Sequence, residues 1–592
     1  MSEPKYSFAP SKEGNNFRIA TFSPEKEVSL WVDGQIKSMK KTNEGFWETE
    51  ISLEFTSSLY GFMVNGEGPY PDPGGRFMPD GIGGLSQLIG MDSYGWINNN
   101  WTGLPVEKYI IEEVHVGTYT EPGTYSGMEQ RLEHLSNLGV TAVEIMPVAQ
   151  FYGSRNWGYD GVYLYSPHFG YGTPDQLKHL VDAIHGRGMC AVLDVVYNHS
   201  GPLGNYLDKY AQYHNTGYST PWGNCFNLDG PGSDGIREYI LQNAIFWLSE
   251  FRFDALRLDA VHGIVDHSPL HILKEMALRV ENLERETGRI INLIAESDSN
   301  DRMLAKEISK CGTGMDAQWN DDFHHVVHTA LTGEKEGYYM DYGAEDEIST
   351  VMNSGFLYQG QYSRYLKRRR GTVWDNHKSN LIVCSQNHDQ IGNRAHGERL
   401  ISIAGEGKAR LAALLTIMSP FTPLLFMGEE TGERSPFLFF MQTEDSDFAR
   451  AVYQGRKDEF KRFRWNDTPD PSSFGTFLES KIKWDRLNGK DAGDFLNLYS
   501  RLISLRKSYV LPRRDEFSCK MGKNRVLEIM YGKGLLMLAS FNENTVVMKA
   551  PDNGWKLVLE TSNGGNTVRR TADTGTFVLE PFSGAIFINE ET

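Results

Sequence analysis

Eight short apolar runs, separated by longer segments with amphipathic helical patterns, constrain the fold of this chain more than any other feature. Strand-like and helix-like segments that alternate are typical of α/β proteins with a parallel sheet. Eight such units predict a TIM (β/α)8 barrel with insertions. An open doubly wound sheet is the alternative, but no glycine-rich phosphate loop follows the first run. The runs cover residues 110–116, 141–146, 190–197, 253–259, 290–296, 315–319, 380–385 and 422–427.

The segments on either side of these runs alternate between apolar and polar residues, as half-buried β-strands do. Residues 28–32 and 46–51 show this alternation before the runs, and residues 526–530 and 535–539 show it after them. Turn signals between the N-terminal segments are expected for a small antiparallel sandwich. We therefore expect an N-terminal immunoglobulin-like β-sandwich over residues 1–95, a barrel over 96–510 and a C-terminal antiparallel β-sandwich over 511–592.

The charge and cysteine content argue against several classes of protein. A formal net charge of −18 disfavours a nucleic-acid groove, which needs clustered Lys and Arg. We interpret the short basic run at residues 367–370 as the solvated end of a helix. The five cysteines are widely spaced and show no metal-ligand spacing. No apolar stretch reaches about 18 residues and the first residues lack a secretory core, so we expect a cytoplasmic protein outside the membrane.

Charged and polar side chains end four of the eight runs. The strands of a TIM barrel end at one face, and active sites are built there. For Arg257 and Asp259 alone, a structural ion pair would be the alternative interpretation. The same kind of ending on four runs favours one shared site. Its candidate residues are Asp194 and His199 after the third run, Arg257, Asp259 and His262 after the fourth, Glu296 after the fifth, and His388 and Asp389 after the seventh.

A pair of carboxylates on neighbouring strands suits glycoside cleavage. Retaining enzymes hold a nucleophile and a general acid about 5–5.5 Å apart, and neighbouring strands lie about 4.8 Å apart. Asp259 and Glu296 fit these two roles, and Arg257 would keep Asp259 ionised. Glu296 follows an apolar pair of residues, a setting that raises the pKa of a carboxyl group as a general acid requires.

Metal and serine chemistry are the alternatives for these polar residues. A zinc site would use the histidines, but no H-x-x-x-H helix and no cysteine pair is present. No Gly-x-Ser-x-Gly segment indicates a serine hydrolase. We therefore expect neither a metal nor another cofactor.

The four strand-end segments resemble the motifs of the α-amylase superfamily, the retaining glycoside hydrolases of family 13. The resemblance implies that Asp259 is the nucleophile, Glu296 the general acid and base, and Asp389 the residue that stabilises the transition state. It implies that Tyr159 stacks on the cleaved sugar, while Trp157 is either a substrate contact or a core aromatic. The other substrate-site residues that it implies are Asp194, which supports the site, His199, Arg257 and His388, and His262 is a further candidate from its place at the end of the fourth run.

Further segments resemble the trehalose-releasing members of this superfamily, which cleave the α-1,4 bond next to a terminal α,α-1,1-linked glucose pair. The expected partners are an oligosaccharide with this end and the enzyme that forms it. Asp321 either contacts the terminal glucose or caps the following helix. Ser299 departs from the pattern, because a leucine is expected there. The segments are residues 76–81, 114–120, 295–298, 318–325, 386–394 and 426–430.

Two other functions stay open. A 1,4-α-glucan branching enzyme has the same barrel and nucleophile but transfers the glucan, and its motifs on the fifth and seventh strands generally read differently. A non-catalytic glucan-binding protein could be built on the same barrel. The presence of all three acids argues against it.

Overall fold

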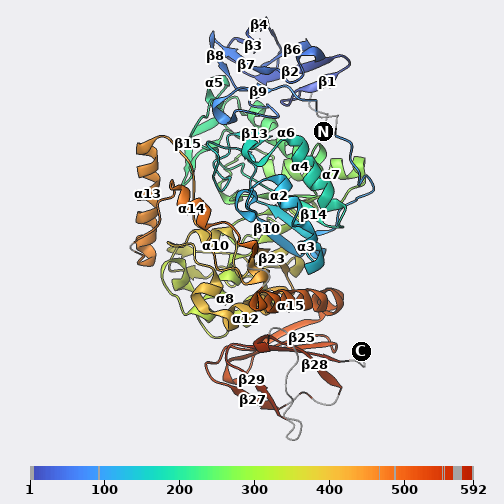
Figure 1. Cartoon of the computed structure of the whole chain (residues 1–592), viewed down its shortest axis with the longest axis vertical. Helices are drawn as coiled ribbons and strands as arrows, with labels where there is room; N and C mark the ends of the chain where they lie inside the picture. Colours follow the sequence, from blue (N-terminus) through green and yellow to red (C-terminus); the bar gives the residue numbers. More distant parts are fainter. Residues whose placement is uncertain are drawn as a thin grey trace.

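The computed structural model describes residues 6–90, 94–465, 467–485, 489–549, 551, 554–563 and 576–589. A closed barrel of eight parallel strands forms its centre, with antiparallel sheets at the two ends of the molecule (Figure 1). Each barrel strand lies inside the apolar run that predicts it, so the predicted TIM barrel is confirmed. In order around the barrel the strands are β10 (Ile111–Val114), β11 (Ala142–Ile145), β14 (Cys190–Val195), β17 (Ala255–Leu258), β18 (Asn292–Ala295), β19 (Ala317–Trp319), β22 (Leu381–Val383) and β23 (Thr422–Phe426).

Antiparallel sheets flank the barrel in the chain order that the sequence predicts. The first N-terminal sheet holds β1 (Ser11–Glu13), β2 (Asn16–Phe22), β6 (Phe46–Ser52) and β5 (Lys40–Lys41), and the second holds β4 (Gln35–Ser38), β3 (Val28–Val32), β7 (Leu59–Val64), β8 (Glu67–Tyr70) and β9 (Ser86–Gln87). The C-terminal sheets hold β24 (Phe517–Met521), β25 (Val526–Tyr531), β26 (Leu535–Ser540), β30 (Gly584–Asn589) and β28 (Trp555–Glu560), and the pair β27 (Val546–Lys549) and β29 (Thr576–Leu579). We propose domain boundaries near residues 95 and 510 on this basis.

The helices surround the barrel and fill its insertions. The start of α4 shows why such a helix begins where it does, because Thr173 and Gln176 form a reciprocal capping box and Pro174 occupies the first turn. The helices are α1 (Val116–Tyr119), α2 (Tyr125–Glu129), α3 (Leu132–Leu138), α4 (Pro174–His185), α5 (Leu207–Tyr210), α6 (Ser233–Ser249), α7 (Ile272–Thr287), α8 (Asp321–Thr332), α9 (Glu347–Ser354), α10 (His388–Gly392), α11 (Leu400–Ala404), α12 (Glu406–Ile417), α13 (Ser446–Phe460), α14 (Phe474–Glu479) and α15 (Lys490–Leu505).

Four insertions rise from the barrel and build the walls of the site. They are the hairpin of β12 (Ala149–Gln150) and β13 (Tyr163–Pro167), the hairpin of β15 (His214–Thr220) and β16 (Gly223–Phe226), the segment between α8 and β22, and the segment with α13 after β23. Helix α13 stands along one side of the barrel in Figure 1. The segment between α8 and β22 contains the hairpin of β20 (Tyr362–Ser363) and β21 (Arg368–Arg369).

The interpretation of residues 367–370 as a solvated helix end is wrong. Arg368 and Arg369 form strand β21, and Arg370 turns inward from its end. The guanidinium of Arg370 lies 3.3 Å from the carboxylate of Asp322 and donates to the Tyr342 hydroxyl at 2.8 Å. The run was misread because its partner Asp322 lies about fifty residues earlier in the sequence, where no local pattern reveals it.

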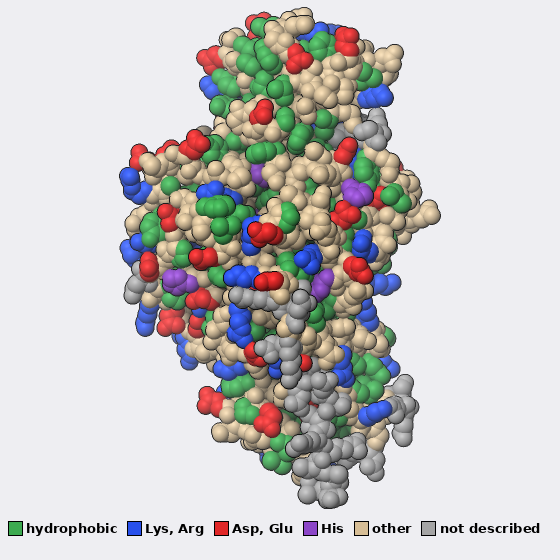
Figure 2. All heavy atoms as spheres, viewed as in Figure 1, with side chains coloured by type: hydrophobic (Ala, Val, Ile, Leu, Met, Phe, Trp, Pro, Cys, Tyr) green, Lys and Arg blue, Asp and Glu red, His purple; other side chains and the backbone are tan. Residues whose placement is uncertain are grey.

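On the face shown in Figure 2, Lys and Arg lie scattered among Asp and Glu. Among the described residues, no helix is both long enough and apolar enough to span a membrane.

Arg506 links the end of the last helix to the barrel. Its side chain is fully buried and donates to the carbonyl oxygens of Ile417 and Ser419 at 2.7 Å, and also to that of Phe421. These carbonyls lie at and just after the C-terminus of α12, where the helix dipole favours a cation.

We expect Arg506→Met to destabilise the protein, because it leaves three carbonyl groups without this donor at about 1–3 kcal/mol each. Differential scanning calorimetry should show a melting temperature lowered by several degrees. Arg450→Met is the matched control, since the Arg450 side chain is 75% exposed, and it should stay close to wild type. Equal melting temperatures for the two variants would contradict this role of Arg506.

Candidate active site

Asp259 and Glu296 lie side by side at the ends of neighbouring strands. β17 pairs with β18 in parallel, and the two residues follow directly after these strands. Ala260 donates its backbone N–H to the Glu296 carboxylate at 2.5 Å. Ala260 has a φ of 39°, a left-handed conformation that is uncommon for a residue with a side chain. The turn after Asp259 is therefore built to orient the carboxylate of Glu296.

The Arg257 guanidinium joins the acids of the site. It donates to both oxygens of Asp194 and to Asp259, each at 2.9 Å, and lies 3.8 Å from the Glu296 carboxylate. Its flat face packs on the Trp319 ring, 4.2 Å from the ring centre. Burial lowers the pKa of Arg257, but the charge of Asp194 and the other acids outweighs this and raises it. One fixed positive charge thus lies within 4 Å of three carboxyl groups.

Glu296 has the electrostatic surroundings of a proton donor. Burial raises the pKa of Glu296 well above its usual value. The charge of Arg257 lowers it, whereas Asp259, Asp321 and Asp389 raise it further. Burial and the three neighbouring acids therefore favour the protonated form of Glu296, which a general acid requires.

Asp194 supports the site from behind. Its side chain is buried, and besides Arg257 it accepts a hydrogen bond of 2.6 Å from the Tyr159 hydroxyl. Burial raises the pKa of Asp194 to about 6, against the opposing charge of Arg257. Asp194 does not line the cavity described below, so it orients Arg257 and Tyr159 rather than facing a ligand.

Tyr159 and His388 form a stacked pair beside the carboxylates. Their ring centres lie 5.1 Å apart, and His388 Nε2 lies 2.9 Å from the Tyr159 hydroxyl. His388 Nδ1 lies 2.5 Å from a carboxylate oxygen of Glu113, which also accepts the His388 backbone N–H at 3.0 Å. Burial lowers the pKa of His388, but the charge and hydrogen bond of Glu113 outweigh burial and raise it. His388 can therefore donate from Nε2.

His199 and His262 border the site on the side of the β15–β16 hairpin. The His199 ring is stacked against Trp222 with 6.1 Å between ring centres, and Trp222 is 48% exposed. Burial lowers the pKa of His199. Asn198 donates to the Asp259 carboxylate at 3.0 Å. The His262 side chain lies edge-on to Trp222 with 6.0 Å between ring centres.

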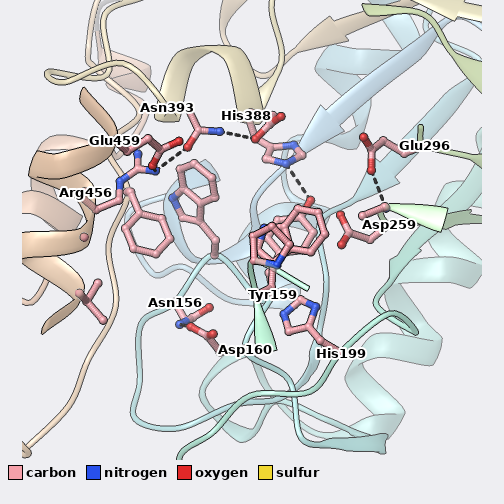
Figure 3. Close-up of a pocket in the computed structure, with 18 of the residues that line it drawn as sticks. Asn156, Tyr159, Asp160, His199, Asp259, Glu296, His388, Asn393, Arg456 and Glu459 are labelled. Atoms are coloured by element: carbon pink, nitrogen blue, oxygen red, sulfur yellow. Dashed lines mark hydrogen bonds and ion pairs between the residues drawn. The ribbon is translucent and has the colours of Figure 1, made fainter. Parts of the chain in front are cut away.

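These side chains line a cavity of about 780 Å³. The cavity is bordered by Asp259, Glu296, Asp389, Arg257, Tyr159, His199, His262 and His388. Figure 3 shows how Asp259, Glu296, Tyr159, His199 and His388 lie around it. Trp157 also borders it, but it is 4% exposed, packs flat on Phe437 and donates its indole N–H to the Leu438 carbonyl at 2.9 Å. Trp157 is thus mainly a buried aromatic residue that packs in the wall of the cavity.

A second cavity, of about 230 Å³, adjoins the first. The two share Glu296, Asp389 and His262, whereas Asp259 and Tyr159 border only the larger one. The smaller cavity continues to Asp321, His325, Tyr338, Tyr342 and Arg370. Glu296 therefore lies at the junction of two spaces, which suits a group that acts on a bond between two sugars.

Asp321 lines the smaller cavity, and the alternative that it caps α8 is wrong. Asn320 is the capping residue, because its side chain accepts the N–H of Phe323. Burial raises the pKa of Asp321 to about 7, and the charge of Asp389 adds to this. Asp322 instead points into the protein, where it accepts from the Tyr342 hydroxyl at 2.7 Å.

Sequence reasoning missed three contributors. Glu113 lies within the first apolar run, where Glu112 and Glu113 interrupt the apolar residues. This pair of buried acids could have marked the position. Trp319 ends the sixth run and could have been found by the same strand-end rule. Trp222 lies at the tip of the β15–β16 hairpin, away from the ends of the barrel strands in the sequence, and no pattern marks it. Among the described residues, no group of three or more His, Cys, Asp and Glu could hold a metal ion.

A barrel with paired carboxylates at a cleft defines this protein as a glycosidase of the α-amylase kind, and the family model "Alpha amylase, catalytic domain" matches residues 87–221. A malto-oligosyltrehalose trehalohydrolase from Saccharolobus solfataricus is 40% identical over 533 residues, 88% of this chain and 92% of that protein. One from Rhizobium sp. is 40% identical over 521 residues, 86% of this chain and 87% of that protein. This chain therefore belongs to the malto-oligosyltrehalose trehalohydrolase family.

Two further comparisons bear on the fold and on the transferase alternative. A crystal structure described as "Putative alpha Amylase from Salmonella typhimurium" superposes with a TM-score of 0.89 at 33% identity, covering 98% of this chain and all of that one. A 1,4-alpha-glucan branching enzyme from Pseudoalteromonas atlantica is 27% identical over 281 residues, which is 42% of this chain. The likeness to the branching enzyme is thus partial, whereas the trehalohydrolases match over nearly the whole length.

The raised pKa of Glu296 predicts an alkaline limb in the pH profile. A general acid must be protonated, so kcat/KM should be full below the pKa of Glu296 and fall as the pH rises through it. Asp321→Asn removes an acid that raises this pKa, so the alkaline limb should move to lower pH. Rate measurements across the pH range on both proteins test this. An unchanged or upward-shifted limb in the variant would count against Glu296 as the titrating acid.

Proposed function

We propose that this protein hydrolyses the α-1,4-glucosidic bond next to the terminal trehalose unit of malto-oligosyltrehalose, releasing trehalose and a malto-oligosaccharide. The names of relatives that match over nearly the whole chain support this proposal. The single observation that carries it is the position of Glu296 at the junction of two cavities, only the larger of which Asp259 borders. The substrate is a glucan-type oligosaccharide with one part in each cavity.

The reaction starts with the ionised carboxylate of Asp259. One of its oxygens attacks the anomeric carbon of the glucose ring in the larger cavity, and the bond from that carbon to the bridging oxygen breaks. The electron pair of that bond goes to the oxygen, which takes the proton of Glu296 and leaves as part of trehalose. Water then attacks the anomeric carbon of the glycosyl ester, and Glu296 takes a proton from the water. The bond from that carbon to the Asp259 oxygen breaks, which restores the carboxylate and releases the malto-oligosaccharide with the configuration of the substrate.

The other residues hold the ring and its charge. Arg257 orients Asp259 through a hydrogen bond of 2.9 Å. Asp389 and the donors His199 and His388 bind the ring hydroxyls as the ring flattens, and Tyr159 offers its ring face as a platform. On the other side of Glu296, His262 and Asp321 border the space for the leaving trehalose.

Product analysis on malto-oligosyltrehalose and on amylose tests this proposal against the transferase alternative. Free trehalose is the expected product of the first incubation, because water is the acceptor. New α-1,6 branches on amylose without free trehalose would support a branching enzyme and overturn the proposal. Binding of both substrates without any product would support the glucan-binding alternative.

Asp259→Asn should remove the nucleophile while keeping the shape of the site. We expect kcat to fall by several orders of magnitude, since single replacements in a catalytic set have large effects. The far-ultraviolet circular dichroism should stay that of the wild type. Turnover close to wild type would show that Asp259 is not the attacking group.

Two expectations about the protein in its cell belong to the same proposal. Functional coupling to a malto-oligosyltrehalose synthase is expected, because such an enzyme would form the terminal α,α-1,1-linked glucose pair that this protein releases. A cytoplasmic location stays a prediction.

A further inference from the structure

Helix α13 forms a wall of the larger cavity, although it comes from the insertion after the last barrel strand. Val452, Gly455 and Glu459 are spaced by three and four residues, so they share one face of the helix. All three line the cavity, and so does Arg462 in the next turn. Figure 3 shows Glu459 on the side of the cavity opposite Asp259 and Glu296. The wall is therefore at some distance from the bond that is cleaved.

Arg456 fixes this wall to the catalytic site. It donates to the Gly392 carbonyl at 2.8 Å and to the Asn393 side chain at 2.7 Å, and Asn393 donates in turn to Asp389. The guanidinium lies over the rings of Phe439 and Phe460, 4.9 and 4.7 Å from their centres. Buried and stacked in this way, Arg456 makes α13 a fixed part of the cavity.

Two features of the wall have no explanation in the packing of the protein. Gly455 lies in the interior of a helix, where glycine costs about 1 kcal/mol relative to alanine. A Cβ atom at this position would meet no other atom within 4 Å, so packing does not require glycine. Arg462 is exposed, and its guanidinium makes no hydrogen bond, ion pair or ring contact with the described part of the chain, so it is free to contact a ligand in the cavity that it borders. A ligand in the cavity would contact both residues.

The chemistry of the wall suits glucose rings. Val452 and the bare backbone at Gly455 offer apolar surface to a ring face, while Glu459 and Arg462 offer an acceptor and donors to hydroxyl groups. The proposed function fixes the direction in which the substrate lies across the site, because the trehalose part leaves through the smaller cavity, on the far side of Glu296. The rest of the malto-oligosyl chain must then continue through the larger cavity, away from the smaller one.

We propose that the cavity face of α13 binds the glucose units that lie beyond the attacked ring, toward the non-reducing end, and so sets the preference for chain length. The face consists of Val452, Gly455, Asp458 and Glu459, together with Arg462, which follows shortly after the end of α13. This inference rests on the proposed function. A substrate with one glucose on trehalose fills only the position of the attacked ring and does not reach α13, whereas a long chain does.

The test compares glucosyltrehalose with maltopentaosyltrehalose. Gly455→Phe fills the space on the wall, so kcat/KM for the long substrate should fall about tenfold, which corresponds to about 1.4 kcal/mol. The value for glucosyltrehalose should stay within about twofold. Arg450→Phe puts the same side chain on α13 at a residue that does not line the cavity, and should change neither value.

Arg462→Ala gives a second, less disruptive measurement if Gly455→Phe fails to fold. It should raise KM for the long substrate several-fold and leave the short one unchanged. Equal losses on both substrates, or an unchanged ratio in both variants, would overturn the inference. If the wild type releases trehalose from neither substrate, the proposed function fails instead. Calorimetric binding of maltohexaose then tests α13 alone, and equal affinities of wild type and Arg462→Ala would overturn it.

Discussion

The contact of the Arg257 guanidinium with Asp194, Asp259 and Glu296 is the interaction on which the site depends. Two ionised carboxylates about 4 Å apart repel each other by about 4 kcal/mol at an effective dielectric constant of about 20. One buried cation cannot fully offset three negative charges, so the protonated form of an acid is favoured here, and the pKa of Glu296 is raised well above its usual value. Asp259 has the closer contact with Arg257, at 2.9 Å against 3.8 Å for Glu296. These surroundings fit the proposed roles of Glu296 as general acid and Asp259 as nucleophile.

The barrel brings these residues together because the side chains along each strand alternate between its two faces, so every second residue points inward. On β17, Ala255 packs in the lower layer inside the barrel, Arg257 lies two residues further on, and Asp259 follows at the mouth. On β18, Ile294 packs inside the barrel in the same way, and Glu296 follows two residues later. The insertions then decide what the site can hold, because Trp222, the segment between α8 and β22, and α13 border the two cavities. The strand ends thus carry the candidate catalytic acids, and the insertions shape the space around them.

The sequence predicts the parts that depend on local pattern. All eight barrel strands lie within apolar runs, and the acids at their ends follow from the same periodicity. Contacts between distant segments could not be read in this way. In the sequence, Glu113 looks like part of a core strand. Only the structure shows that His388, from the end of another strand, contacts it. Arg370 reads as surface charge because Asp322 and Tyr342 are distant in sequence. A resemblance to known motifs supplied the roles, but not the geometry.

The configuration of the product tests the central claim most directly. Trehalose has no free anomeric centre, so only the new reducing end of the malto-oligosaccharide gives a mutarotating signal. Proton NMR in the first seconds of the reaction should show the α-anomer, which later equilibrates with the β-anomer. A retaining reaction through a glycosyl ester on Asp259 requires this order. The β-anomer appearing first would mean direct attack by water and would contradict the assignment of Asp259 as nucleophile.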